Sequence, residues 1–110
     1  MNNLTIIGRL GAEPVVRTTK ETIVARMSLG VNHKKDNVEE TEWLEVILWN
    51  NLASVAQQYY HTGDKVYVKG HLSSSSYEDK EGVTHNVTQI VADDIEKLST
   101  ARRNIQELSK

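Results

Sequence analysis

Residues 41–50, TEWLEVILWN, decide the fold, because they read as a strand with two largely apolar faces. Successive side chains of a strand point to opposite sides of the sheet. One face of this strand carries Leu44, Val46 and Leu48. The other face carries both tryptophans of the chain with a glutamate and an isoleucine: Trp43, Glu45, Ile47 and Trp49. One buried face is enough for a strand of a small domain, so the second face needs a separate explanation.

Four more segments are expected to be strands, from period-two alternation of apolar residues or from many β-branched residues. They are residues 3–10, 21–32, 64–77 and 84–98. Residues 33–40, HKKDNVEE, are expected to form a short loop between the second and third strands. The strands are too many and too short for a helical domain and point to an all-β fold.

A single helix is expected at residues 50–63, where apolar side chains recur at the i, i+3, i+4, i+7 spacing. Asn50 or Asn51 can cap its start, and Gly63 can end it in the left-handed conformation. The order of three strands, a helix and two strands is that of the OB-fold, a five-stranded partly open barrel. The sequence therefore predicts an all-β fold with one helix between strands 3 and 4.

The chain of 110 residues is long enough for one such domain, which we expect to span residues 1–98. Residues 99–110 are expected to form a short tail, and two alternatives stay open for it: an amphipathic helix and a frayed polar segment. Residues 1–10 lack the pattern of a secretory signal, and no apolar run is long enough to span a membrane. We therefore expect a cytoplasmic protein.

The composition argues against most catalytic and metal chemistry. There is no Cys, which excludes disulfides and thiolate sites, and the four His do not pair at metal-ligand spacing. No HExxH, GxSxG or phosphate-binding glycine-rich motif is present. We therefore expect no enzyme activity, no catalytic residue, no metal and no cofactor.

The second face of residues 41–50 has two competing explanations. Trp43 and Trp49 would lie roughly 20 Å apart along a strand that rises about 3.3 Å per residue, which suits two separate platforms for stacked bases. Alternatively, both indoles belong to the core or to a subunit interface. Tyr77 favours stacking, because an aromatic residue beside the turn at residues 78–82 gains little from burial.

Basic residues are spread along the strands and loops, often on the face opposite the core, while acidic residues gather at 36–45, 78–81 and 93–96. A net charge of −2 can therefore hide a basic groove. The expected phosphate contacts are Arg9, Arg17, Lys34, Lys35 and Lys69. Arg26 and Lys65 are basic residues in similar positions on the strands, but they are not among these expected contacts.

The chain resembles the bacterial-type single-stranded-DNA-binding proteins over residues 1 to about 97. The matching pieces are IIGRLGAEPVVR (6–17), ARMSLGVN (25–32), TEWLEVILWNNLASVAQQYYHTGDKVYVKGHL (41–72) and SYEDKEG (76–82). This resemblance implies an OB-fold that stacks bases on Trp43, Trp49 and Tyr77. It also implies sequence-independent binding that protects and holds single strands in DNA replication, recombination and repair, by a homo-oligomer, most simply a tetramer. Tyr67 and Ile47 are the expected oligomer contacts, and the resemblance implies a protein associated with the nucleoid.

The chain also departs from this family. Asn51, Thr62 and Ser76 stand where the family often has Lys or Arg, so fewer counterions would be released on binding. The sequence given stops at Lys110, before the disordered linker and acidic tip that family members use to recruit repair enzymes. Two explanations stay open, a truncated chain and a short form of the family, and from the residues given we expect no tail-mediated recruitment of repair enzymes. An alternative function stays open, a primosomal-type OB-fold module that binds a protein partner, with DNA binding as an accessory.

Overall fold

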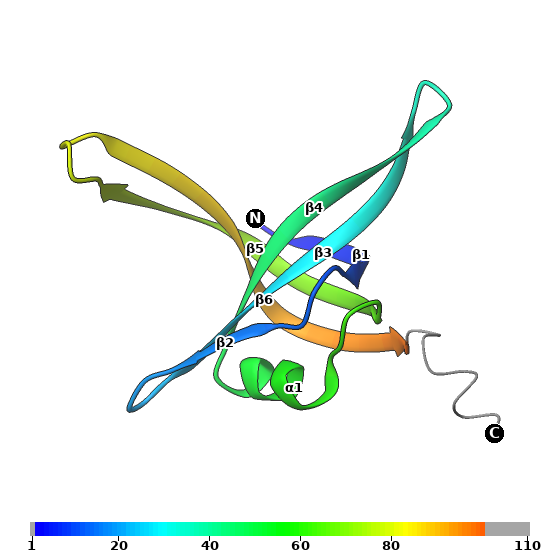
Figure 1. Ribbon diagram of the computed structural model, residues 1–110, viewed down its shortest axis with the longest axis horizontal. Coiled ribbons are helices and arrows are strands. Elements are labelled where there is room, and N and C mark those ends of the chain that lie inside the picture. Colours follow the sequence, from blue (N-terminus) through cyan, green and yellow to red (C-terminus); the bar gives the residue numbers. More distant parts are fainter. Residues whose placement is uncertain (1, 101–110) are drawn as a thin grey trace.

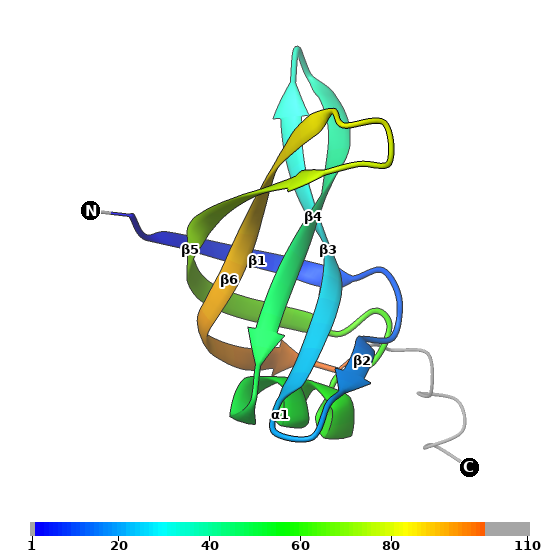
Figure 2. The same cartoon turned by 90° about the vertical axis from the view of Figure 1, so that its left-hand side faces the viewer.

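The computed structural model describes residues 2–100 and consists of six strands and one helix, shown in Figures 1 and 2. The strands are β1 (Leu4–Leu10), β2 (Val15–Thr18), β3 (Ile23–Lys35), β4 (Val38–Trp49), β5 (Lys65–Glu78) and β6 (Thr84–Ser99). The helix is α1 (Asn51–Tyr59), between β4 and β5. The predicted class, all-β with one helix, is confirmed for the part of the chain that the structure describes.

Hydrogen bonding between the strands runs in a ring. The sheet order is β1-β5-β6-β4-β3-β2, and an additional pairing of β1 with β3 brings the order back to its start. β4 and β6 are parallel and pair only at Val46 with Ile90 and at Ile47 with Val91, whereas all other pairings are antiparallel. Five strands therefore make the ring, as predicted, and β2 is a sixth strand that the sequence pattern did not predict.

β2 lies on the same edge of β3 as β1. β1 pairs with β3 at Leu29 and Gly30, and β2 pairs with β3 from Ile23 to Arg26. The chain leaves the sheet between them at residues 11–14, which end in Pro14, a residue without the N–H that a ladder needs. β2 is thus a short continuation of the β1 edge, and its four residues are too few to show a clear alternation.

The core fills the inside of this ring. Its most buried part is built from the predicted inward residues of three strands, β3, β4 and β5, with Ala25, Met27, Leu29, Val46, Leu48, Val66 and Val68 at most 1% exposed. α1 covers one end of the ring (Figure 2) with Ala53 and Ala56, which are both fully buried. Removing such side chains from water is the main favourable contribution to folding.

The helix differs from the prediction at both ends. Asn50 precedes it with a φ of 53° and makes no capping hydrogen bond with its side chain, while its N–H donates to the carbonyl of Ile23 at 2.7 Å. The helix ends at Tyr59 and not at Gly63, because Tyr60 turns to extended backbone. The side chain of Tyr60, 3% exposed, is buried in the core, and this burial ends the helix before a glycine is reached.

Two long hairpins project from the ring and diverge from each other (Figure 1). We call them the β3–β4 arm (residues 31–42) and the β5–β6 arm (residues 74–88), and the rest of residues 2–100 the body. The predicted loop at residues 33–40 is wrong: the strands continue to a two-residue turn at Asp36 and Asn37, whose φ values are 54° and 65°. Such positive φ values are the geometry of a tight hairpin turn.

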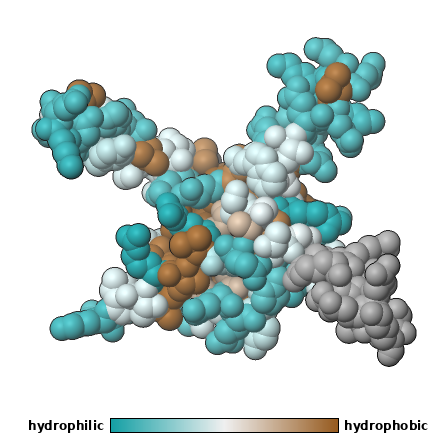
Figure 3. All heavy atoms as spheres, in the orientation of Figure 1, coloured by the Kyte–Doolittle hydropathy of each residue, from teal (hydrophilic) through white to brown (hydrophobic). Residues whose placement is uncertain are grey.

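Figure 3 shows hydrophilic side chains over both arms, with most hydrophobic surface on the body. An ion pair between a buried carboxylate and a partly exposed lysine braces the body. Asp64 is fully buried, accepts a hydrogen bond from the N–H of His61 at 2.9 Å, and lies 3.3 Å from Nζ of Lys97. The backbone carbonyl of the same residue accepts a hydrogen bond from the N–H of Leu10 at 3.0 Å. Asp64 therefore joins the chain after α1 to both β1 and β6.

Candidate nucleic-acid interface

The outer face of β4 carries the two tryptophans in the middle of a continuous surface. Trp43 is 61% exposed and Trp49 is 48% exposed. The register extends this surface across the neighbouring strands, because cross-strand partners point to the same side. Trp43 lies beside Gly30 of β3, which lies beside Arg9 of β1. Trp49 lies beside Val24 of β3, which lies beside Arg17 of β2.

Trp43 rests on two glycines. A Cβ atom at Gly30 would lie 2.9 Å from Cζ3 of the indole, and a Cβ at Gly11 would also overlap this ring. The backbone at these two glycines therefore lies close against the six-membered ring of the indole, while most of the side chain stays exposed. An indole held in this way presents a fixed aromatic surface that is open to a flat ligand.

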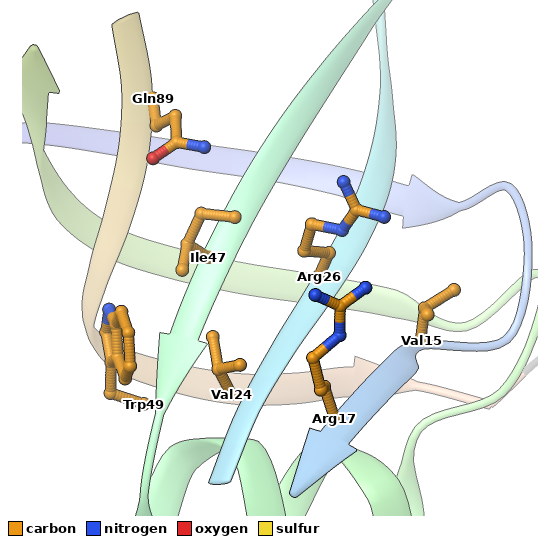
Figure 4. Close-up of a pocket in the computed structure, with 7 residues that line it drawn as sticks. All are labelled: Val15, Arg17, Val24, Arg26, Ile47, Trp49 and Gln89. Carbon is orange, nitrogen blue, oxygen red and sulfur yellow. The ribbon is translucent and has the colours of Figure 1, made fainter. Parts of the chain in front are cut away.

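A pocket of about 260 Å³ lies beside Trp49 and is shown in Figure 4. Its lining comes from four strands: Val15, Arg17, Val24, Arg26, Ile47, Trp49 and Gln89. Figure 4 shows Trp49 on one side, Val24 and Ile47 in the middle, and Arg17 and Arg26 on the other side. The pocket thus combines an aromatic wall, an apolar floor and two guanidinium groups.

Arg26 and Gln89 of this pocket were not among the predicted site residues. Arg26 occupies the non-core parity of β3, which is a signal in the sequence, and it pairs with Ile47 in the sheet. Gln89 is brought to the pocket by the two-residue parallel pairing of β4 and β6, which nothing in the local sequence pattern predicts. Oε1 of Glu45, which precedes Ile47 on the same face, lies 3.7 Å from a guanidinium nitrogen of Arg26.

Tyr77 lies on the β5–β6 arm and is 55% exposed. Its ring stacks on the imidazole of His85, with centroids 5.1 Å apart and an angle of 20° between the planes. Nε2 of His85 lies 2.7 Å from Oδ2 of Asp79, and this contact lowers the pKa of the Asp79 carboxyl, with a smaller contribution from the N–H of Val83. His85 and Asp79 hold Tyr77 in place on an arm that has no core of its own.

The predicted phosphate contacts fall into three groups. Arg17 lines the pocket beside Trp49, and Arg9 lines a second hollow of about 300 Å³ that also includes Gly30 and Lys65. Lys34 and Lys35 lie at the end of the β3–β4 arm, where Lys34 faces Glu39 across the hairpin.

Lys69 forms the third group, because the sheet register leaves it apart from the aromatic side chains. It is paired with Thr5 of β1 and Asp94 of β6. The fold therefore gathers Arg9 and Arg17 beside the tryptophans, places the two arm lysines further along the hairpin, and leaves Lys69 opposite an acid.

The two predicted oligomer contacts differ in exposure. Tyr67 is half-buried on the outer face of β5, opposite Ile7 of β1, which is 49% exposed. Ile47 is only 5% exposed, because it forms part of the pocket floor. Tyr67 with Ile7 therefore leaves apolar surface accessible, whereas Ile47 has little surface exposed.

Residues 2–100 hold no group of three or more acidic or histidine side chains placed to bind a metal ion. Within the same residues, no helix has the length and apolar character needed to cross a lipid bilayer. The alternatives predicted for the tail at residues 99–110 fall almost wholly on residues 101–110, outside the described part of the chain.

Comparison with known proteins identifies relatives for nearly the whole chain. A family model described as the single-strand binding protein family matches residues 1–98. A protein of Bacteroides thetaiotaomicron named single-stranded DNA-binding protein is 30% identical, over 94% of this chain and 70% of the relative. A protein of Neisseria meningitidis serogroup A with the same name is 32% identical, over 94% of this chain and 63% of the relative.

A third relative, named single-stranded DNA-binding protein 1, comes from Streptococcus pyogenes serotype M6. It is 34% identical, over 96% of this chain and 84% of the relative. The chain thus spans just under two thirds of the Neisseria protein and more of the other two.

Proposed function

The chain belongs to the single-strand binding protein family, and on that premise we propose that it binds single-stranded DNA without regard to sequence. Its ring of five strands, with the helix after the third, is the OB-fold. OB-folds that hold single strands without sequence preference combine a basic groove with aromatic platforms, and this chain has the parts for both. The observation that carries the proposal is the exposure of Trp43 and Trp49 on one face of β4.

Bases stack on Trp43, Trp49 and Tyr77 in this proposal. All three rings are about half exposed or more, although aromatic side chains in a domain this small would gain free energy from burial. Every base has a flat π-face, so stacking on these rings is tolerant of sequence. Trp43 and Trp49 belong to the body, and Tyr77 extends the path onto the β5–β6 arm.

Phosphates lie against Arg9, Arg17, Lys34 and Lys35. Arg9 and Arg17 support this proposal best, because the register places them in the same cross-strand rows as Trp43 and Trp49. Lys34 and Lys35 extend the path along the β3–β4 arm. Lys69 has the weakest support, since it faces Asp94 on a different part of the ring.

The protein acts as a non-catalytic partner of single-stranded DNA in replication, recombination and repair, and needs no cofactor in this proposal. It works as a homo-oligomer, most simply a tetramer, in which the half-exposed Ile7 and its neighbour Tyr67 meet another subunit. Residues 1–98 form the binding domain, which is the range that the family model matches.

A fluorescence titration tests the proposal directly. Oligo-dT should quench the indole emission of the wild-type protein, and duplex DNA of the same length should not. Trp43→Ala and Trp49→Ala should each weaken binding by about 1–3 kcal/mol, the usual value of one stacked base. The affinity of Tyr77→Ala, which keeps both indoles, is measured by anisotropy of labelled oligo-dT.

Tyr59→Ala is the matched control, because Tyr59 is 58% exposed but lies on α1. Its affinity for oligo-dT should equal that of the wild type. Unchanged affinity in both tryptophan variants would refute the stacking platforms. A wild-type protein that binds neither form of DNA would refute the function itself.

A further inference from the structure

The pocket beside Trp49 has a composition that fits one unit of a polynucleotide. Trp49 offers a π-face, Val24 and Ile47 make an apolar floor, and the guanidinium groups of Arg17 and Arg26 lie on the far side (Figure 4). A nucleotide joins a flat base to an anionic phosphate, so it has one part for each side of the pocket. Guanidinium groups suit the phosphate because they donate two parallel hydrogen bonds to its oxygens.

Glu45 places a negative charge beside Arg26, on the guanidinium side of this pocket. Its side chain lies on the outer face of β4 between the two tryptophans, and Oε1 is 3.7 Å from a guanidinium nitrogen of Arg26. Glu45 and Arg26 also line a neighbouring hollow of about 150 Å³. A strand that passes from Trp43 to Trp49 must therefore cross this carboxylate.

The ion pair between Arg26 and Glu45 is open to exchange. Both side chains are more than half exposed, and ion pairs of this kind are weak in water. A phosphate can thus replace the carboxylate on Arg26 without exposing a buried charge. The carboxylate does not leave the surface when this happens, so it repels the phosphate that replaced it.

Building on the proposed function, in which this pocket seats a nucleotide with its base on Trp49 and its phosphate at Arg17, we propose that the same phosphate also contacts Arg26. Glu45 competes with that phosphate for Arg26 and so limits the strength of binding. Two consequences follow. Neutralising Glu45 strengthens binding, and the gain depends on the presence of Arg26.

The experiment compares wild type, Arg17→Gln, Arg26→Gln, Glu45→Gln and the double variant Arg26→Gln/Glu45→Gln. Each is titrated with oligo-dT at several concentrations of NaCl. Glu45→Gln should bind about fivefold more tightly, because the phosphate then no longer has to break the ion pair of Glu45 with Arg26; this factor is the attraction of two unit charges about 4 Å apart in water. Arg17→Gln and Arg26→Gln should each bind more weakly and lower the slope of log affinity against log salt by about 0.7.

Glu21→Gln is the matched control, since it removes the same charge from an exposed residue in the turn between β2 and β3. It should leave the affinity close to that of the wild type. Misfolding cannot mimic the result for Glu45→Gln, because the expected change is a gain of affinity. A thermal melt of each arginine variant checks that a loss of affinity is not a loss of fold.

The double variant decides whether Glu45 acts through Arg26. In the Arg26→Gln background, Glu45→Gln should give clearly less than its fivefold gain. An equal gain in both backgrounds would overturn the competition, and unchanged salt slopes in both arginine variants would overturn the nucleotide seat. Either result with normal binding by the wild type leaves the proposed function intact, whereas failure of the wild type to bind oligo-dT refutes that function first.

Discussion

The body and the two arms are made of the same strands, yet they are held in different ways. In the body, alternate residues of β3 and β4 such as Met27, Leu29 and Val46 are almost fully buried. In the β3–β4 arm the same strands continue for several residue pairs with nearly every side chain exposed or half-exposed. Hydrophobic burial fixes the body, and backbone pairing with surface contacts fixes the arms.

This difference places different constraints on the residues of the body and of the arms. Body positions have to satisfy the core, so they show the alternation that makes the fold predictable. Arm positions are free of that demand, so their residues can serve a ligand. Mutations should therefore separate the two regions: core residues of the body control the free energy of unfolding, and arm residues control the free energy of binding alone.

The largest effect is expected at the buried carboxylate of the body. Asp64→Ala should lower the free energy of unfolding by about 3–5 kcal/mol, because it leaves Lys97 and the N–H of His61 without their partner. Asp93→Ala is the control, since Asp93 pairs with His71 at 3.0 Å on the surface and should cost only about 0–1 kcal/mol. Urea unfolding measures both, and equal losses would contradict the view that burial, which only the body provides, fixes the fold.

A second pair of variants compares a core leucine of the body with an exposed leucine where the body meets an arm. Leu48→Ala should cost about 2–5 kcal/mol of unfolding free energy, because the side chain is fully buried and its removal leaves a cavity. Leu72, at the base of the β5–β6 arm, is 46% exposed, and Leu72→Ala should cost much less. The comparison fails if chemical denaturation gives the two variants the same midpoint.

The third variant lies on an arm and should affect binding alone. Tyr77→Ala should weaken oligo-dT binding by about 1–3 kcal/mol through the loss of one stacked base. Its melting temperature should stay near that of the wild type, because the ring stacks on His85 at the surface of the arm, away from the core. Anisotropy and a thermal melt on the same sample check both statements. A large fall in melting temperature would show that the arm supports the body.

The smallest effect concerns the link between residues 11–14 and the chain after α1. Oε1 of Glu13 lies 2.8 Å from Nδ1 of His61, and Oε2 accepts hydrogen bonds from the N–H and the hydroxyl of Thr62. These contacts, with His61 the largest, lower the pKa of Glu13 from 4.5 to about 2. A carboxyl whose pKa is lowered by folding stabilises the fold above its ordinary pKa and loses this effect on acidification.

Glu13→Gln should therefore lower the melting temperature slightly at neutral pH. The difference from the wild type should shrink as the pH falls from about 4.5 through about 2. Thermal melts from pH 7 to pH 2 measure this difference. A gap that stays constant over the whole range would show that the link does not depend on the charge of Glu13.

Much of the fold could be predicted from the sequence because the core faces only one side of each strand. The alternation of Leu44, Val46 and Leu48 against Trp43 and Trp49 separated the buried from the exposed face of β4 correctly. β2 was missed because four residues cannot show a period. The end of α1 was misplaced because the burial of Tyr60, a tertiary contact, stopped the helix before Gly63.

The candidate site was predictable only where its residues lie on one strand or its direct neighbours. Trp43 and Trp49 could be predicted as site residues from the alternation of β4 alone. Arg17 could be predicted as one because it lies beside the core strands. The pocket could not be predicted, because it needs the pairings of β3 with β4 and of β4 with β6 to bring Gln89 and Arg26 together. The ion pair of Arg26 with Glu45 likewise depends on a register that no local pattern specifies.

The short parallel contact between β4 and β6 has a consequence for the reach of the protein. Because the two strands run in the same direction, both arms leave the ring at the same end of that contact, and because it joins only two residue pairs they separate at once (Figure 1). Lengthening or shortening either hairpin by matched residue pairs would leave the ring untouched. The length of polynucleotide that the protein covers can thus change in evolution independently of how the protein folds.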